Sequence, residues 1–244
     1  MKLFEVHDLR YRVGDKVLIE LDHLAIDGQE LNLVLGANGS GKTTLLRCLA
    51  GLLAAEGRIL FKGKSLATYS PIERARAIGW VPSQLQLGFE MSVSELVQLG
   101  RYPWHEGYPR AHDRAQVTTS LEQLGIASLA HRSLATLSSG ESQKVQIARA
   151  LACEVECLIL DEPCAHLDVG ARYEMMRILK GLVSQGKTVL MSSHDLYLAP
   201  RFSSRFLSLR AGRVIAYQAE QPGRGALRQL YSIDEELGDD FLDE

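Results

Sequence analysis

The sequence of 244 residues predicts an α/β fold that consists of an α/β core, a β-rich N-terminal part and a helical insertion. Two stretches predict the core: an apolar run at 31–35 leads through a glycine-rich loop into a helix, and another apolar run at 157–160 ends in two acids. Between them, residues 85–144 change to helical patterns broken by a Pro- and Gly-containing piece, which indicates an inserted subdomain.

The remaining elements are predicted from alternation, turn residues and caps. We expect short strands at 3–6 and 17–21, separated by Tyr11, Arg12 and a Gly14-Asp15 turn. Further along the chain, strands are predicted at 58–61, 78–81 and 188–192, and helices at 42–51, 72–77, 93–100, 113–124, 143–151 and 171–183.

The composition favours a globular protein without a membrane span or a secretory signal. The chain has 46% hydrophobic and 23% charged residues and a formal net charge of −3, which is ordinary for a globular protein. Its apolar runs are shorter than the roughly 18 residues of a membrane span, and its N-terminus lacks the apolar stretch of a secretory signal. Four cysteines without zinc spacing favour buried, reduced thiols in a cytosolic protein.

The acidic residues are unevenly distributed. Residues 234–244 contain seven acids and neither Lys nor Arg. We interpret this segment as a solvated C-terminal tail, with a regulatory role as the alternative.

The glycine-rich loop matches the pattern G-x-x-x-x-G-K-[ST] through Gly36, Gly41, Lys42 and Thr43. Glycines let successive backbone N–H groups face an anion at a helix N-terminus. Lys42 can reach the β and γ phosphates of a nucleoside triphosphate, and the Thr43 hydroxyl can ligate the Mg²⁺ that bridges them. The strand and helix on either side disfavour a chance glycine-rich turn. The predicted phosphate-binding residues are Gly36, Ala37, Asn38, Gly39, Ser40, Gly41, Lys42, Thr43 and Thr44.

Tyr11 lies 25 residues before Gly36. We predict that its ring stacks on a purine base, although a tyrosine at the end of a strand more commonly packs on the edge of a core.

Acidic and imidazole groups follow two predicted strands. Asp161 and Glu162 stand at the carboxyl end of the strand at 157–160, where α/β sheets bind ligands. Asp161 can therefore hold Mg²⁺ through its water shell, while Glu162 orients an attacking water. His194, just after the strand at 188–192, can bind a γ-phosphate or that water. The alternatives are surface acids and a structural histidine.

The segment Leu137–Leu151 predicts a second helix start that directs N–H groups toward an anion. Its hydroxyl- and glycine-rich turn precedes a helix whose first N–H groups are free. By itself this pattern also fits an ordinary capped helix.

With these motifs in order, the chain resembles the nucleotide-binding subunit of ATP-binding cassette (ABC) proteins over nearly its whole length. GANGSGKTT resembles the Walker A motif, LSSGE the family signature, CLILDE the Walker B motif, His166–Asp168 the D-loop, and His194 the switch histidine. The resemblance implies a P-loop NTPase core over 1–84 and 145–233 and a helical subdomain over 85–144.

The resemblance also implies that two cassettes pair head to tail and bind two ATP molecules. Residues of the signature and the D-loop would then contact the nucleotide held by the other chain. These residues are Ser138, Ser139, Gly140, Glu141 and Asp168.

Three positions depart from the family pattern. Ala37 replaces the usual Walker A proline, and Ser139 takes the place of the first signature glycine, whose backbone conformation it must fit. Ser83 occupies the usual glutamine position of the Q-loop, and Gln84 comes one residue later. We predict that Gln84 reaches Mg²⁺ and the γ-phosphate.

Several segments are similar to the ATPases of importers for ferric siderophores, haem and cobalamin, the LGRYPW segment at 99–104 above all. This similarity implies an ATPase homodimer, peripheral on the cytoplasmic face of the cell membrane. Its partners would be two integral membrane permease subunits and, indirectly, a substrate-binding protein.

The alternatives are the ATPase of another transporter and a soluble ABC ATPase outside transport. A long coiled-coil insertion or a second cassette, typical of the latter, is missing from the sequence. Dispersed Lys and Arg residues argue against a nucleic-acid partner. A purely regulatory module would be expected to lose Glu162 or His194, and both are present.

Overall fold

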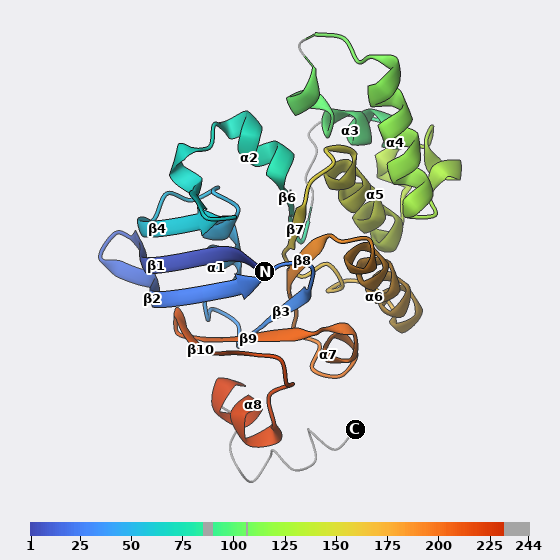
Figure 1. The fold of residues 1–244 in the computed structure, drawn as a ribbon. Coiled ribbons are helices and arrows are strands. Elements are labelled where there is room, and N and C mark those ends of the chain that lie inside the picture. Colours follow the sequence, from blue (N-terminus) through green and yellow to red (C-terminus); the bar gives the residue numbers. More distant parts are fainter. Residues whose placement is uncertain (85–89, 106, 232–244) are drawn as a thin grey trace.

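The computed structural model describes residues 1–84, 90–105 and 107–231, and a six-stranded sheet lies at its centre (Figure 1). The strand order is β10-β9-β3-β8-β7-β6; β10 is antiparallel to β9, and the other neighbours are parallel. The strands are β3 (Leu31–Leu35), β6 (Ile78–Val81), β7 (Cys157–Leu160), β8 (Thr188–Ser192), β9 (Arg205–Arg210) and β10 (Arg213–Gln218). The predicted strands at 78–81, 157–160 and 188–192 are confirmed.

A four-stranded antiparallel sheet forms the N-terminal part, in the order β2-β1-β4-β5. Its strands are β1 (Lys2–Val13), β2 (Lys16–Asp27), β4 (Glu56–Phe61) and β5 (Lys64–Ser65). Strands are present at both predicted positions but are longer than predicted, because Tyr11 and Arg12, expected to separate them, belong to β1. Cross-strand pairs such as Tyr11 with Ile19 continue the ladder beyond the apolar runs, up to the turn at Gly14.

The central strands β3, β7 and β8 are buried along their whole length, and most of their residues are apolar. In β3, Leu31, Leu33 and Leu35 face one core, while Val34 faces the other. Helix α1 (Lys42–Leu49) and the N-terminal sheet cover the Val34 face. The opposite face is covered by α5 (Ser139–Ala152), α6 (Val169–Ser184), α7 (Leu198–Phe202) and α8 (Arg224–Tyr231).

The segment after β6 carries the helical subdomain (Figure 1). Its helices α3 (Val93–Leu99) and α4 (Ala111–Gln123) pack against α5 through buried aliphatic residues. Helix α2 (Pro71–Ala77) precedes β6, and α2 and α3 each begin with a serine capping box, at Ser70 and Ser92. Short 3₁₀ turns lie at Leu66–Thr68, Tyr102–Trp104, Ala127–Leu129 and Leu134–Thr136.

Helix α5 starts four residues earlier than predicted. The Ser138 hydroxyl accepts from the Glu141 N–H, and the Glu141 carboxylate accepts from the Ser138 N–H, so a capping box begins the helix at Ser139. The helix then runs without a break to Ala152, which places the signature and the centre of the core on one rigid element.

The described residues contain no helix that combines the length and the apolar character needed to cross a bilayer. The four cysteines are buried and unbonded, as predicted. Burial raises the pKa of the Cys48 thiol to about 11, so the thiol stays protonated at neutral pH.

Arg101 ties the helical subdomain to the core, although only 1% of its side chain is exposed. Its Nε donates to Asp113 at the start of α4 over 3.0 Å, and its Nη1 donates to the Ala152 carbonyl and to Glu154 beyond the end of α5. The guanidinium also lies 5.3 Å from the centre of the Trp104 ring. The buried guanidinium therefore has hydrogen-bond and ring partners in both the helical subdomain and the core.

We expect Arg101→Met to lower the free energy of unfolding by about 3 kcal/mol, because Asp113 loses the cation with which it is buried. Lys62→Met is the matched control. Lys62 pairs with Glu156 over 2.7 Å, but both groups are exposed, so its loss costs less than about 1 kcal/mol. Urea denaturation of the two variants measures both costs, and equal costs would contradict the assigned role of Arg101.

Candidate functional site

The phosphate-binding loop connects β3 to α1, and its backbone requires glycine at particular points. Gly39 and Gly41 have φ of 75° and 103°, which residues with a Cβ rarely adopt. A Cβ at Gly41 would also lie 2.8 Å from Cδ1 of Ile19. The loop therefore packs directly on β2. Asn38 and Gly39 form its exposed tip, while Ser40 is buried and Thr44 is half-buried in α1.

Lys42 lies across this loop with 5% of its surface exposed. Its ammonium donates to the Gly36 carbonyl over 2.7 Å and to the Ala37 carbonyl over 3.1 Å. Burial lowers the pKa of Lys42, while the charges of Glu162 and Asp161 act in the opposite direction. Ala37 stands in place of the usual proline, and the turn still forms. The Ala37 carbonyl accepts from the Ser40 N–H at 3.1 Å, which closes this turn.

Thr43 and Asp161 meet where α1 begins and β7 ends. The Thr43 hydroxyl lies 2.9 and 2.8 Å from the two carboxylate oxygens of Asp161. The described residues contain no group of three or more His, Cys, Asp or Glu side chains that could enclose a metal. A hydroxyl and one carboxylate nevertheless suit Mg²⁺, which takes few protein ligands and keeps water and phosphate oxygens.

Glu162 has a constrained backbone and a close partner. Its φ is 49°, in the left-handed region that is unusual for residues with a Cβ. The Ser192 hydroxyl accepts from the Glu162 N–H over 2.9 Å and donates to Asp161 Oδ1 over 2.8 Å. His194 Nε2 lies 2.6 Å from Glu162 Oε1. Residues at the ends of β7 and β8 thus form one connected group.

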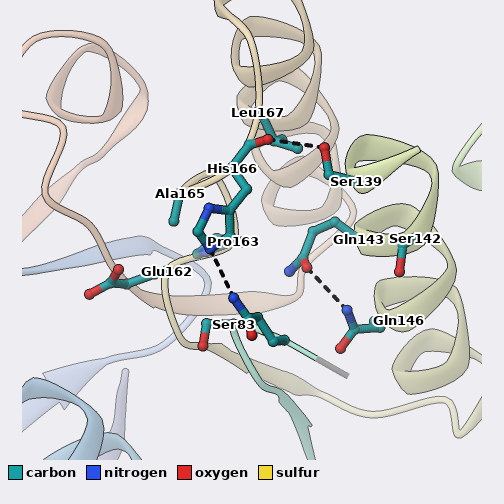
Figure 2. A pocket seen from close by; sticks show the side chains of 11 residues that line it. Ser83, Ser139, Ser142, Gln143, Gln146, Glu162, Pro163, Ala165, His166 and Leu167 are labelled. Carbon is teal, nitrogen blue, oxygen red and sulfur yellow. Dashed lines mark hydrogen bonds between the residues drawn. The ribbon is translucent and has the colours of Figure 1, made fainter. Parts of the chain in front are cut away.

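A polar cavity of about 290 Å³ adjoins this group between α5 and residues 162–167 (Figure 2). Gln143 and Gln146 of α5 are almost completely buried, and the Gln146 amide donates to Gln143 over 3.2 Å. Both Ser83 and Gln84 line the cavity. The remaining lining residues are Ser139, Ser142, Glu162, Pro163, Ala165, His166 and Leu167.

Gln84 is directed to His166, with 3.2 Å between Nε2 of each side chain. The described contacts do not join it to Thr43 or Asp161, so its predicted role toward Mg²⁺ and the γ-phosphate stays a prediction.

The signature and the D-loop lie against each other at the N-termini of α5 and α6. Ser139 is the first residue of α5, so it has a right-handed helical backbone that serine adopts without strain, and its hydroxyl donates to the His166 carbonyl over 3.0 Å. A Cβ on Gly140 would lie 3.8 Å from Ala171. Asp168 caps α6 by accepting from the Ala171 N–H over 2.8 Å.

Tyr11 is partly buried against the core under the N-terminal sheet. It pairs across the hairpin with Ile19, the residue that packs on Gly41. This places Tyr11 on the strand next to the one that supports the loop. Its stacking on a base stays a prediction.

The roles of Ser192 and Tyr231 at the site were not predicted. Ser192 bridges Asp161 and the Glu162 backbone, and the Tyr231 hydroxyl accepts from the Gly36 N–H over 3.2 Å. Ser192 could have been found only with the strand order in hand, because β8 must lie beside β7. Tyr231 is 195 residues from Gly36 and belongs to no motif.

Comparison with known proteins gives the family. The model of the ABC transporter family matches residues 22–165. The iron(3+)-hydroxamate import ATP-binding protein FhuC of Bacillus subtilis is 33% identical over 97% of this chain and 90% of its own length. The hemin import ATP-binding protein HmuV of Deinococcus radiodurans is 38% identical over 86% of this chain and 82% of its own.

Among solved structures, an inward-facing putative metal-chelate type ABC transporter matches with a TM-score of 0.79. The identity is 26%, and the match covers 94% of this chain and 88% of the other. The fold predicted from the motifs is thereby confirmed. The chain belongs to the ABC transporter family, as one of its ATP-binding subunits.

Proposed function

We propose that a homodimer of this chain hydrolyses ATP to drive the import of an iron chelate, such as a ferric siderophore or haem, or of cobalamin. It would work from the cytoplasmic face of the membrane, where it would bind two permease subunits. A substrate-binding protein would deliver the cargo to these permease subunits. The observation that carries the proposal is the contact of Glu162 with His194 beside the phosphate-binding loop. Resemblance to import ATPases for iron-hydroxamate and hemin supports the cargo class.

ATP binding uses the loop and its lysine. Backbone N–H groups at the start of α1 face the phosphates, and the Lys42 ammonium exchanges its loop carbonyls for phosphate oxygens. Thr43 and Asp161 would hold Mg²⁺, and Gln84 is the proposed third ligand. When bound, Mg²⁺ neutralises charge on the β and γ phosphates.

Hydrolysis needs a base in line with the γ-phosphate. Glu162 fits this role: one carboxylate oxygen is fixed by His194, which leaves the other to accept a proton from the attacking water. The left-handed backbone of Glu162 aims its side chain, and the Ser192 hydroxyl holds that backbone. Lys42 stabilises the negative charge that develops on the γ-phosphate oxygens.

Pairing would complete each site. The signature residues Ser138–Glu141 and the capping residue Asp168 lie side by side at two helix N-termini. Helix N-termini favour anions, so this edge suits the phosphates bound by a second copy. We infer the head-to-tail arrangement from this edge together with the family resemblance.

An apolar groove supports docking to a permease. It has a volume of about 400 Å³ and lies between α2, the edge strand β6 and the helical subdomain. Leu52 and Leu99 at the groove are each about half exposed, at 54% and 50%. Leu99 and Pro103 come from the segment that most resembles import ATPases. Exposed apolar groups gathered in this way mark an interaction surface.

Glu162→Gln should leave MgATP binding intact and lower steady-state hydrolysis by about 100-fold or more, because the amide cannot accept the proton. Fluorescent-nucleotide titration and phosphate release measure the two effects. Glu156→Gln, which changes an exposed acid, is the control. Sustained turnover by the Glu162 variant would exclude it as the base.

Ser192→Ala should lower kcat by about tenfold, because Asp161 and the Glu162 backbone lose the hydroxyl that orients them. Ser193→Ala removes a neighbouring buried hydroxyl that accepts from the Asp195 N–H, and it should keep normal turnover. Phosphate-release kinetics compare the variants. Equal kcat values would show that the bridge does not support hydrolysis.

Leu99→Asp should weaken binding to the permease pair by roughly 2 kcal/mol, because docking would bury an unpaired carboxylate. Ile215→Asp is the control, since Ile215 is 62% exposed on β10 at the opposite edge of the central sheet. Co-purification with the membrane subunits measures association. Recovery of the wild-type chain with ribosomes or DNA instead would contradict the import function.

A further inference from the structure

We propose that Tyr231 is a positioning residue for the phosphate-binding loop, and that the C-terminal helix α8 thereby sets the affinity of the chain for MgATP. The inference rests on the proposed function of the loop as an ATP site. It adds a residue that lies outside every motif recognised in the sequence.

The contact lies where β3 ends and the loop begins. The ladder between β3 and β8 ends at Val34, and that between β3 and β9 ends at Leu35. Gly36 is buried and follows directly, so its N–H needs a partner other than a strand. The Tyr231 hydroxyl supplies it over 3.2 Å.

The same glycine connects Tyr231 to Lys42. Gly36 donates its N–H to the tyrosine and accepts the Lys42 ammonium on its carbonyl at 2.7 Å. A shift of Gly36 therefore displaces the phosphate-binding lysine together with the loop. Within the part of the chain that the structure describes, no hydrogen bond joins Tyr231 to Lys42, so Tyr231 acts through the loop backbone.

Helix α8 holds the ring in place. Leu227 and Leu230 are buried, with 5% and 4% exposed, in the same core as Leu33 and Leu35 of β3. Burial raises the pKa of Tyr231, and the negative charge of Glu162 adds to this shift. The hydroxyl thus stays neutral at physiological pH and lies within the electrostatic reach of Glu162.

The C-terminal segment supports the loop at a second point. The Gly212 N–H, in the turn between β9 and β10, donates to the Ser40 carbonyl over 2.8 Å. The Gly212 carbonyl accepts from the Glu20 N–H at 2.9 Å, which ties this turn to β2. Residues of the segment 205–231 therefore hold the loop at Gly36 and at Ser40. The contact at Gly36 comes from the Tyr231 side chain, and the contact at Ser40 comes from the Gly212 backbone.

Tyr231→Phe keeps the ring and removes only the hydroxyl. The Gly36 N–H then lacks its acceptor, so the loop adopts other conformations as well and only a fraction of the molecules can bind ATP. The apparent affinity for ATP falls in proportion to that fraction. We expect the Kd for MgATP and the KM to rise about tenfold, with kcat at saturating ATP unchanged.

Tyr217→Phe is the matched control. The Tyr217 hydroxyl also accepts from a backbone N–H, that of Asp27, and donates to Asn32 over 2.7 Å at the opposite end of β3. This variant should lose thermal stability and keep the wild-type Kd for MgATP.

Titration with a fluorescent ATP analogue, phosphate-release kinetics and thermal melting distinguish the outcomes. A higher Kd for Tyr231→Phe alone supports the inference. An unchanged Kd, or equal increases in both variants, would overturn it while leaving the ATP site in place. Failure of the wild-type chain to bind the analogue would overturn the proposed function as well.

Discussion

The buried carboxylate of Asp161 is the group on which the site depends. It is 6% exposed, and an anion at that depth must be satisfied by donors or cations. Two hydroxyls satisfy it, from Thr43 at the start of α1 and from Ser192 at the end of β8. One donor follows β3 and the other ends β8, so the carboxylate fixes the loop, Glu162 and His194 relative to one another.

This arrangement follows from parallel strands. Strands β3, β8 and β7 are neighbours and run in the same direction, so their carboxyl ends open onto the same edge. Each strand is followed by a residue of different chemistry: Gly36, His194 and Glu162. The three strands therefore place these residues at one edge of the sheet, close to one another.

The site residues and several strands were predictable from short sequence patterns. The loop, the paired acids and the histidine each follow a short apolar strand, and β6 and β8 have the predicted bounds because their apolar runs end at turn residues. Strand β1 was underestimated because charged residues on its open face interrupt the apolar pattern while cross-strand pairing continues. The start of α5 was missed because the serine and glycine of the signature were read as a turn, although Ser138 and Glu141 cap each other.

Contacts between distant segments escaped prediction for a physical reason. Ser192 acts through two hydrogen bonds and Tyr231 through one, and a single hydroxyl leaves no periodicity or composition signal. Their partners are fixed only by the strand order and by the packing of α8 on the sheet. The role of Gln84 depends in the same way on contacts between distant segments, since its side chain lies beside His166.

The continuity of α5 has a mechanical consequence. Fourteen helical residues span about 21 Å, and the helix touches the apolar groove near its C-terminal end and the polar cavity near its N-terminal end. A helix is stiff along its axis, so a push on Arg149 or Ala150 at the groove would also displace Ser139 at the proposed nucleotide edge. The capping box at Ser138 and the buried Arg101 network hold the two ends, so α5 would transmit force between the proposed permease-docking groove and the proposed nucleotide edge.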